Sequence, residues 1–415
     1  MCSSDLYGSG TYGASYTVPA AAAMFDGGAS AVYTYRLGSG GTCASKTLGS
    51  GLTVTAKYPG SLSIGVSVQE KLGDSTKKQF IVYVGTTQTE VWEFDADGAN
   101  EGENLISAAK SSNYVTVSGE SSVVSVLAAA SGALTGGANP TVTNEDYSKA
   151  FAALEAFYYN TIALDVDDDE EMTLSLLLQA YLENAYKVGK LGIAVVGSKS
   201  DVDFETRLAK AKAFNDAKVV FLGSGYMVGN ESKDGVLAIC YTAGAIASTP
   251  TNMGITHAIV GGATELCETL TYHQYESAIS SGMLMLSMST SGNVWYDSGV
   301  NTLTVPEAGT QDNGWKKIRR VKTRFELIDR LDRVLSPKVG RVSADTDGIA
   351  DVVQTGQRVL DAMVTEGKLL TGATFIEDPA NPYSGDSAWF IIQADDIDSL
   401  EKIYLQYQFR YSQNS

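Results

Sequence analysis

The sequence has few of the residues that usually support catalysis or cross-linking. Its 415 residues include only two histidines and four cysteines, and no two cysteines form a CxxC pair. A zinc ribbon and a thioredoxin-type motif are therefore excluded. We expect the thiols to be unpaired and buried, as in a reducing compartment. The four cysteines are Cys2, Cys43, Cys240 and Cys267.

Long apolar runs and basic residues are also scarce. No run of 18 apolar residues occurs, so we expect no membrane-spanning helix. The apolar stretch at residues 20–24 is short and follows no basic segment, so we expect no signal peptide. Lys and Arg number 30 against 48 Asp and Glu, for a net charge of −18. This balance disfavours general nucleic-acid binding, because neutralising phosphates requires a basic surface.

The length and the overall composition are those of a folded protein with several domains. Hydrophobic residues make up 44% and charged residues 19% of the chain. The length predicts two to four domains of about 100–200 residues each.

The first third of the chain has the pattern of β-structure. Short segments rich in β-branched and aromatic residues alternate with turn signals, which is typical of a small barrel or sandwich. We predict a β-barrel or sandwich domain over residues 25–130. The expected strands are residues 30–37, 52–57, 62–70, 79–85, 89–94, 114–118 and 122–127.

A glycine-rich segment at residues 131–143 is predicted to be a linker, and no lysine follows its glycines as a phosphate loop requires. From Asn144 onward the apolar period becomes helical, and short apolar strands alternate with helices. This order predicts an α/β domain over residues 144–304 with a parallel or mixed sheet. The expected strands are residues 161–166, 191–196 and 218–222, and the expected helices start near 144, 174, 203 and 235.

The last third is predicted to be an α+β domain over residues 305–401. Ile318, Val321, Phe325, Ile328, Leu331 and Leu335 recur at helical spacing, and Ser336-Pro337 ends that helix. A second helix is expected over residues 349–366 with Gly367 after it, and a strand over residues 388–394. Residues 402–411 then alternate strictly. The apolar side of this segment consists of Ile403, Leu405, Tyr407, Phe409 and Tyr411.

Candidate metal and catalytic residues do not form a convincing set. The acidic run at residues 165–171 lacks the glycine of an EF-type loop, and a solvated turn before a helix accounts for it better. Cys267 and His273 are six residues apart, no G-x-S-x-G elbow occurs, and nothing orients His257 or His273 as a base. We therefore expect no enzyme activity, no metal and no cofactor.

The basic residues are concentrated in one segment. Residues 316–341 carry ten basic and three acidic side chains, or +7, whereas the rest of the chain carries −25. Such separation can draw copies of a chain together, so we predict an interface with another copy. A solvated helix face is the simpler alternative, and an anionic partner such as nucleic acid is disfavoured by the acidic remainder. The predicted interface residues are Lys316, Lys317, Arg319, Arg320, Lys322 and Arg324.

The alternating segment near the C-terminus allows two interpretations. It can complete the sheet of its own domain, or it can pair with the sheet edge of a neighbouring molecule, where backbone donors and acceptors need partners. We predict the second arrangement, with residues 402–415 as a linking arm and its apolar side at the interface between subunits.

The order of several segments resembles the tail sheath protein family of contractile phages, prophages and phage-tail bacteriocins. The resemblance covers about residues 25–415. The segments that carry it are VYTYRLGSGG (32–41), LTVTAKYPGSL (52–62), ALTGGANPTVTNEDYSKAFAALE (133–155), NTIALDVDDDE (160–170), VNTLTV (300–305), KKIRRVKTRFELIDRLDRV (316–334) and DSLEKIYLQYQF (398–409).

The resemblance implies a β-domain, an α/β domain that is subtilisin-like in fold without its triad, and a C-terminal α+β domain. It also implies stacked rings of subunits around an inner tube, linked by N-terminal and C-terminal arms that augment the C-terminal-domain sheets of neighbours. The C-terminal arm matches residues 402–411. The N-terminal arm has no counterpart, so we expect a truncated start with residues 1–24 poorly structured.

The function implied is that of a structural subunit whose sheath contracts and drives the tube through a cell envelope. The implied partners are other copies of the chain, the inner tail tube protein, and baseplate and tail terminator proteins, without nucleic acid or membrane insertion. The implied location is the virion tail, with assembly in the host bacterial cytoplasm. Two alternatives are a hydrolase that uses the α/β domain and a β-rich surface attachment protein.

Overall fold

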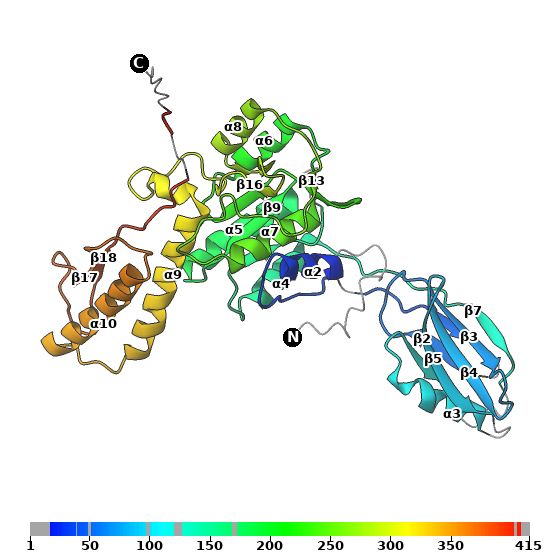
Figure 1. The fold of residues 1–415 in the computed structure, drawn as a ribbon. Helices are drawn as coiled ribbons and strands as arrows, with labels where there is room; N and C mark the ends of the chain where they lie inside the picture. Colours follow the sequence, from blue (N-terminus) through cyan, green and yellow to red (C-terminus); the bar gives the residue numbers. More distant parts are fainter. Residues whose placement is uncertain are drawn as a thin grey trace, which may run out of the picture. The chain divides into compact units, whose positions relative to one another are not determined.

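A computed structural model describes residues 17–38, 40–48, 51–96, 100–119, 127–167, 172–401 and 405–407. The chain divides into two compact units (Figure 1). The β unit contains residues 33–154, and the α/β unit contains residues 19–32 and 155–415. The domain boundaries expected within the α/β unit, at residues 304 and 401, stay predictions.

The β unit contains two antiparallel sheets around one core. The first has the order β1-β2-β6 and the second the order β5-β4-β3-β7. Alternate residues of the inner strands, such as Val54, Val66 and Phe80, are buried in a shared apolar cluster. Five of the predicted strands are confirmed as β2 (Thr53–Ala56), β3 (Ile64–Glu70), β4 (Lys77–Val84), β5 (Thr87–Asp95) and β6 (Val115–Ser118). The sequence analysis missed β1 (Ser45–Thr47), α3 (Glu101–Ala108) and η1 (Ala109–Ser111).

Two expectations for the β unit differ from the structure. Residues 30–37 form no strand, because the alternating Tyr33 and Tyr35 are both exposed and cover no core. The expected linker at residues 131–143 begins inside β7 (Ala130–Ala133), which pairs with β3. A side chain at Gly132 would lie 2.7 Å from Lys46 Nζ, so glycine lets the lysine lie across this strand. The strand expected at residues 122–127 lies largely outside the described residues.

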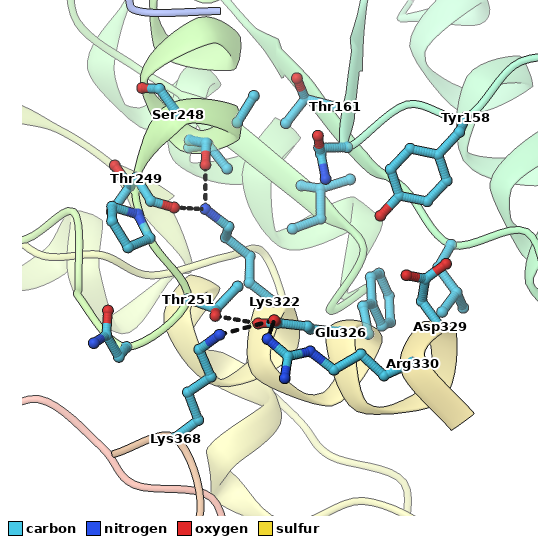
Figure 2. Close-up of a pocket in the computed structure, with 18 of the residues that line it drawn as sticks. Tyr158, Thr161, Ser248, Thr249, Thr251, Lys322, Glu326, Asp329, Arg330 and Lys368 are labelled. Carbon is cyan, nitrogen blue, oxygen red and sulfur yellow. Dashed lines mark hydrogen bonds and ion pairs between the residues drawn. The ribbon is translucent and has the colours of Figure 1, made fainter. Parts of the chain in front are cut away.

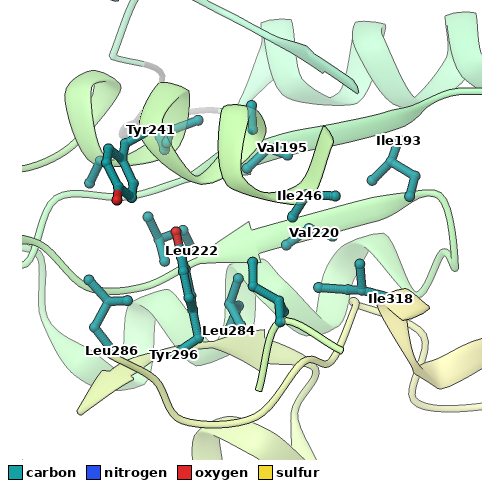
Figure 3. Packing of buried hydrophobic residues seen from close by; sticks show 14 of the residues in the cluster. Ile193, Val195, Val220, Leu222, Tyr241, Ile246, Leu284, Leu286, Tyr296 and Ile318 are labelled. Carbon is teal, nitrogen blue, oxygen red and sulfur yellow. The ribbon is translucent and has the colours of Figure 1, made fainter. Parts of the chain in front are cut away.

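The α/β unit is built on a parallel sheet with the order β14-β10-β9-β8, as the alternation of strands and helices predicts. Its strands are β8 (Thr161–Ala163), β9 (Ile193–Gly197), β10 (Val219–Leu222) and β14 (Met283–Leu284). Figure 3 shows the core between this sheet and α7 (Val236–Ser248), where Val195, Leu222 and Ile246 pack together. Three further helices of this unit are α5 (Thr173–Lys187), α6 (Phe204–Phe214) and α8 (Tyr272–Ser280).

Local signals explain where several of these helices begin. Asp203 caps α6 by accepting a hydrogen bond from the Thr206 amide, and Thr271 caps α8 with Gln274 as its partner in a capping box. The predicted helix at Asn144 is α4 (Asn144–Leu154), which clusters with the β unit. The sequence analysis missed the short antiparallel strands β11 (Tyr226–Val228), β12 (Glu231–Lys233), β13 (Glu265–Leu266), β15 (Leu286–Met288) and β16 (Val294–Tyr296).

The long helix α9 (Ile318–Leu335) contributes to two hydrophobic cores. Its first turns place Ile318, Val321 and Phe325 in the core of the parallel sheet. Its last turns place Leu331 against α10 (Thr346–Thr365) in a second core with Leu360. Figure 1 shows α9 (yellow) between the parallel sheet and α10 with β17 (Thr374–Glu377) and β18 (Phe390–Gln393). The helix follows η3 (Asn313–Lys316) and continues into η4 (Ser336–Lys338).

The first described helix corrects the expectation of poor structure before residue 25. Residues from Thr17 to Asp26 form α2, with Ala20 and Ala21 buried. The helix packs closely on α7 because Gly244 has no side chain: a Cβ there would lie 2.1 Å from the Met24 carbonyl oxygen. Small residues on both helices therefore permit the contact. Residues 1–16 lie outside the described part of the chain.

We predict that Gly244→Ala weakens the docking of α2 on α7. Alanine is favoured over glycine within a helix by about 1 kcal/mol, but a clash with backbone costs about 1–3 kcal/mol. The expected result is a lower free energy of unfolding of the α/β unit, measured by chemical denaturation. The control Gly65→Ala places a Cβ no closer than 3.7 Å to its neighbours and is expected to be tolerated. Equal stability of Gly244→Ala and the wild type would refute the close contact.

Candidate functional site

The predicted basic interface lies around the first turns of α9, and most of its cations contact acidic or polar groups of the same chain. Asp396 lies between two guanidinium groups: Arg320 Nη2 and Arg324 Nη2 each lie 2.9 Å from Asp396 Oδ1. The Asp396 side chain is only 6% exposed. Two arginines thus converge on one nearly buried carboxylate, a strongly paired arrangement.

The same face of α9 holds the residues that follow Asp396. Lys317 forms an ion pair with Glu401, and Glu401 Oε1 also accepts a hydrogen bond from Thr256 Oγ1 at 2.8 Å. Arg319 Nη1 donates to Ser399 Oγ at 3.1 Å. We call this set of side chains the ionic clasp. It consists of Lys317, Arg319, Arg320, Arg324, Asp396, Ser399 and Glu401.

Residues just before α9 shape the clasp. Arg324 also pairs with Asp312, at 2.9 Å between Nη1 and Oδ1, and stacks on the Trp315 ring at 4.6 Å. Gly314 gives the guanidinium groups room, since a Cβ there would lie 2.3 Å from Arg320 Cζ. Burial by itself raises the pKa of Asp396, but the hydrogen bonds from Arg320 and Arg324 outweigh burial and hold that pKa below its usual value. Asp396 therefore stays ionised inside the clasp.

Lys322 connects α9 to the end of α7. Its ammonium group donates to the backbone carbonyl oxygens of Ile246 and Thr249, which lie at the C-terminal end of α7. A cation is favoured there because the carbonyls of the last helical turn have no partners within the helix. Burial lowers the pKa of Lys322 from 10.5 to about 8. The side chain therefore acts inside the subunit and is not free for an acidic surface elsewhere.

A cavity of about 680 Å³ lies beside Lys322, between α7, the loop after it and α9 (Figure 2). The acidic side chains in its lining are paired with cations in the same lining. Glu326 accepts from Lys368 at 2.8 Å, and Glu366 from Arg330 at 2.8 Å. The hydrogen bonds from Arg330 and Lys368 lower the pKa of Glu366 to about 2. These pairs connect α9 to the end of α10. The charged side chains that line the cavity therefore stabilise the packing of these helices rather than form an active site.

The residues considered for catalysis lie apart. His273 is on α8 with its side chain 88% exposed, whereas the ring of His257 stacks on Trp295 with centroids 4.0 Å apart. Cys267 contacts Ser232 and Met227 rather than a histidine. Within the described residues, no cluster of three or more His, Cys, Asp or Glu could hold a metal ion. Part of the acidic run, residues 168–171, lies outside them.

The structure describes only part of the predicted linking arm. Leu405 and Tyr407 are 69% and 72% exposed and are not in a strand. Ile403, Phe409 and Tyr411 lie outside the described residues. Lys316 is half-buried, and its side chain has no ion-pair partner in the described part of the chain. The interface role predicted for these residues stays a prediction.

The sequence analysis missed the acidic partners of α9. Asp395, Asp396, Asp398 and Glu401 form an acidic stretch directly after the predicted last strand. Matching this stretch with the basic segment at residues 316–341 could have indicated the clasp, because the two segments carry opposite charge. The contrast of +7 in the basic segment with −25 in the rest of the chain as a whole does not identify these four residues as the partners.

Comparisons with known proteins agree with this fold. Residues 140–302 match the family model of the phage tail sheath protein central domain. Over 408 residues the chain is 25% identical to the uncharacterised protein YqbK of Bacillus subtilis (strain 168), covering 92% of this chain and 82% of that protein.

Two crystal structures of sheath tail proteins are similar in fold. The protein from Desulfitobacterium hafniense gives a TM-score of 0.68 at 21% identity, over 88% of this chain and 83% of that one. The protein from Listeria innocua gives 0.57 at 19% identity, over 87% and 82%. The predicted resemblance to contractile tail sheath proteins is confirmed, and the fold is a mixed α+β arrangement of several parts. This similarity favours a structural role over an enzymatic one. No helix in the described ranges is long and apolar enough to span a membrane.

The depressed pKa of Lys322 predicts a pH dependence of stability. The unfolded chain keeps this proton up to about pH 10.5, whereas the folded chain releases it near pH 8. Stability contributed by this group therefore rises as pH increases from 8 to 10.5. We expect the melting temperature of the wild type, relative to Lys322→Met, to increase over this range. The matched control is Lys190→Met, at an exposed lysine. The same pH dependence relative to both variants would contradict the assignment to Lys322.

Proposed function

We propose that the chain is a structural subunit of a contractile tail sheath, which polymerises around an inner tube and contracts to drive it through a cell envelope. The match of residues 140–302 to the sheath central domain and the fold similarity support the class. The single observation that carries the linking mechanism is a small sheet in the α/β unit with two available edges.

This sheet consists of β17 and β18 alone, paired antiparallel with Phe375 opposite Ile392. Phe375 is buried against Gly356 of α10, whereas Ile376 on the other face is 41% exposed. In the described ranges, no further strand pairs with either outer edge. Two-stranded sheets are marginal in water, and free edges accept strands from other chains.

The last segment of the chain suits such an edge. Residues 402–411 alternate between apolar and polar side chains, as a strand with one covered face does. We infer that the arm of one copy adds a strand to the β17–β18 sheet of another, through Ile403, Leu405, Tyr407, Phe409 and Tyr411. Backbone hydrogen bonds then tether neighbours while their bodies move as rigid units during contraction.

Fewer side chains of the basic segment are available for an interface between copies than its net charge predicts. Five of the six predicted interface cations contact groups of their own chain, whereas the side chain of Lys316 has no hydrogen bond or ion pair among the described residues. We propose that Lys316, together with the exposed Arg341, contacts an acidic surface of a second copy. Such exposed charges steer association more than they add affinity.

The finer parts of the proposal follow the family resemblance. They are a β unit of the barrel or sandwich kind, a subtilisin-like central domain without a triad, and domain limits near residues 130, 143, 304 and 401. The proposed partners are the inner tail tube, baseplate and tail terminator proteins. The proposed location is the tail of a virion assembled in the host bacterial cytoplasm.

We predict that deleting residues 402–415 leaves a folded subunit that no longer polymerises. The deletion removes the strand to be donated but no residue of the described cores. Circular dichroism would check folding, and sedimentation with negative-stain microscopy would detect rings or tubes.

The matched control deletes only residues 412–415, which follow the alternating segment and leave it intact. We expect this variant to assemble as the wild type does. Tubes formed by the chain that lacks residues 402–415 would refute the role of the arm.

A further inference from the structure

In the proposed strand exchange, the β17–β18 sheet of a neighbour and that of the same chain compete for the C-terminal arm. A terminal strand that can pair with the sheet of a neighbour can also pair with the same sheet in its own chain. If a short flexible connection joins the arm to its own sheet, the effective concentration of the arm at that sheet is in the millimolar range. An arm that is free from the end of β18 onward would therefore close on its own subunit unless something prevents the closure.

Closure on the outer edge of β18 requires a hairpin turn soon after Gln393, the last residue of that strand. Hairpin loops usually contain two to five residues, roughly. The residues available for the turn are Asp395, Asp396, Asp398 and Ser399. Asp and Ser are common in turns because their side chains hydrogen-bond nearby backbone groups. The sequence after β18 is thus able to form a turn that would return the arm to its own sheet.

The structure holds this segment in a different conformation. The Leu370 amide donates to the Asp395 carbonyl at 2.8 Å, and the Ile397 amide donates to the Lys368 carbonyl at 3.0 Å. These bonds continue the β17–β18 pairing beyond β18, so the chain proceeds forward and does not reverse. The ionic clasp then fixes Asp396, Ser399 and Glu401 to the start of α9.

The end of the clasp at Ser399 and Glu401 contacts the loop after α7 as well as α9. Glu401 accepts from Thr256, in the loop after α7, and a Cβ on Gly254 in that loop would lie 2.8 Å from Ser399 Oγ. Eight residues, 394–401, lie between the end of β18 and the arm.

We propose that the ionic clasp prevents the C-terminal arm from closing on its own β17–β18 sheet and so directs it to the same sheet of a second copy of this chain. This inference rests on the proposed function. The clasp fixes the point of departure of the arm at Glu401 and removes residues 395–399 from use as a turn. Opening the clasp converts an exchanged strand into a self-paired one, the reverse of domain swapping.

Two variants open the clasp in different ways. Asp396→Asn removes the carboxylate shared by Arg320 and Arg324, and its matched control is Asp395→Asn, an exposed neighbour with the same change in charge. The double variant Arg320→Gln with Arg324→Gln removes both guanidinium groups, and its matched control replaces the exposed Arg333 and Arg358 by glutamine. The second pair keeps the test valid if the first clasp variant does not fold.

The first measurement is hydrogen exchange on the full-length chain, diluted until it is monomeric. In the wild type we expect slow exchange at residues 395–401 and fast exchange at residues 402–411. In either clasp variant we expect the reverse pattern. Exchange becomes faster at residues 395–401 than in the wild type, and it becomes at least about tenfold slower at residues 402–411 because the arm pairs with its own sheet. The second measurement is the critical concentration for assembly, which we expect to rise roughly tenfold or more.

Fast exchange at residues 402–411 in a variant with an opened clasp, together with a wild-type critical concentration, would overturn the inference. The outcome differs from a failure of the proposed function. If the wild type forms no polymer, the proposed function fails, and if the chain without residues 402–415 still polymerises, the proposed role of the arm fails. The exchange measurement on monomers decides the clasp inference in that case too, because it does not require assembly.

Discussion

The α/β unit depends on one helix, α9. Its apolar side chains are buried in two cores, and most of its charged side chains are paired with other groups of the same chain. α9 buries Ile318 and Val321 in the core of the parallel sheet and Leu331 in the core with α10. Each fully buried aliphatic side chain contributes roughly 1.5–3 kcal/mol to stability. Because α9 buries such side chains in both cores, this one helix holds the two cores together. The remaining faces of α9 carry cations, which would be costly near these cores without partners. Ion pairs within the same chain meet that requirement at Asp396, Glu401, Glu326 and Glu366.

This pairing changes the meaning of the charge separation in the sequence. A segment with ten cations beside an acidic remainder suggests attraction between copies, but most of the attraction is used within one subunit. The clasp holds the segment before the arm, and Lys322 holds the end of α7. Electrostatics therefore hold residues 396–401 against the start of α9, and in the proposed function the backbone edges of β17 and β18 link neighbouring copies. Order within the subunit then depends on ion pairs, and the proposed linkage between subunits depends on backbone hydrogen bonds.

Much of the fold is predictable from periodicity, because periodicity reflects burial. The strands at Val66 and Phe80 and the helix with Val321 and Leu331 each have one covered face, and the sequence predicts them. The strand expected around Tyr33 fails because alternation occurs there without burial. β7 is missed because Ser131 and Gly132 look like a linker, although the strand pairs with β3 and Lys46 lies across Gly132. α2 is missed because its docking depends on the absence of a side chain at Gly244, which is distant in sequence.

The candidate site was less predictable than the fold. The sequence predicts which cations are concentrated in one segment. It does not predict their partners, because these lie about 72 to 84 residues away in the chain and only the folded structure brings them together. The linking role of the arm is tested most directly by electron cryomicroscopy of an assembled polymer of this chain. The account predicts that residues 402–411 of one copy form a third strand on the β17–β18 sheet of another. A continuous connection of that strand to β18 of the same copy would contradict it.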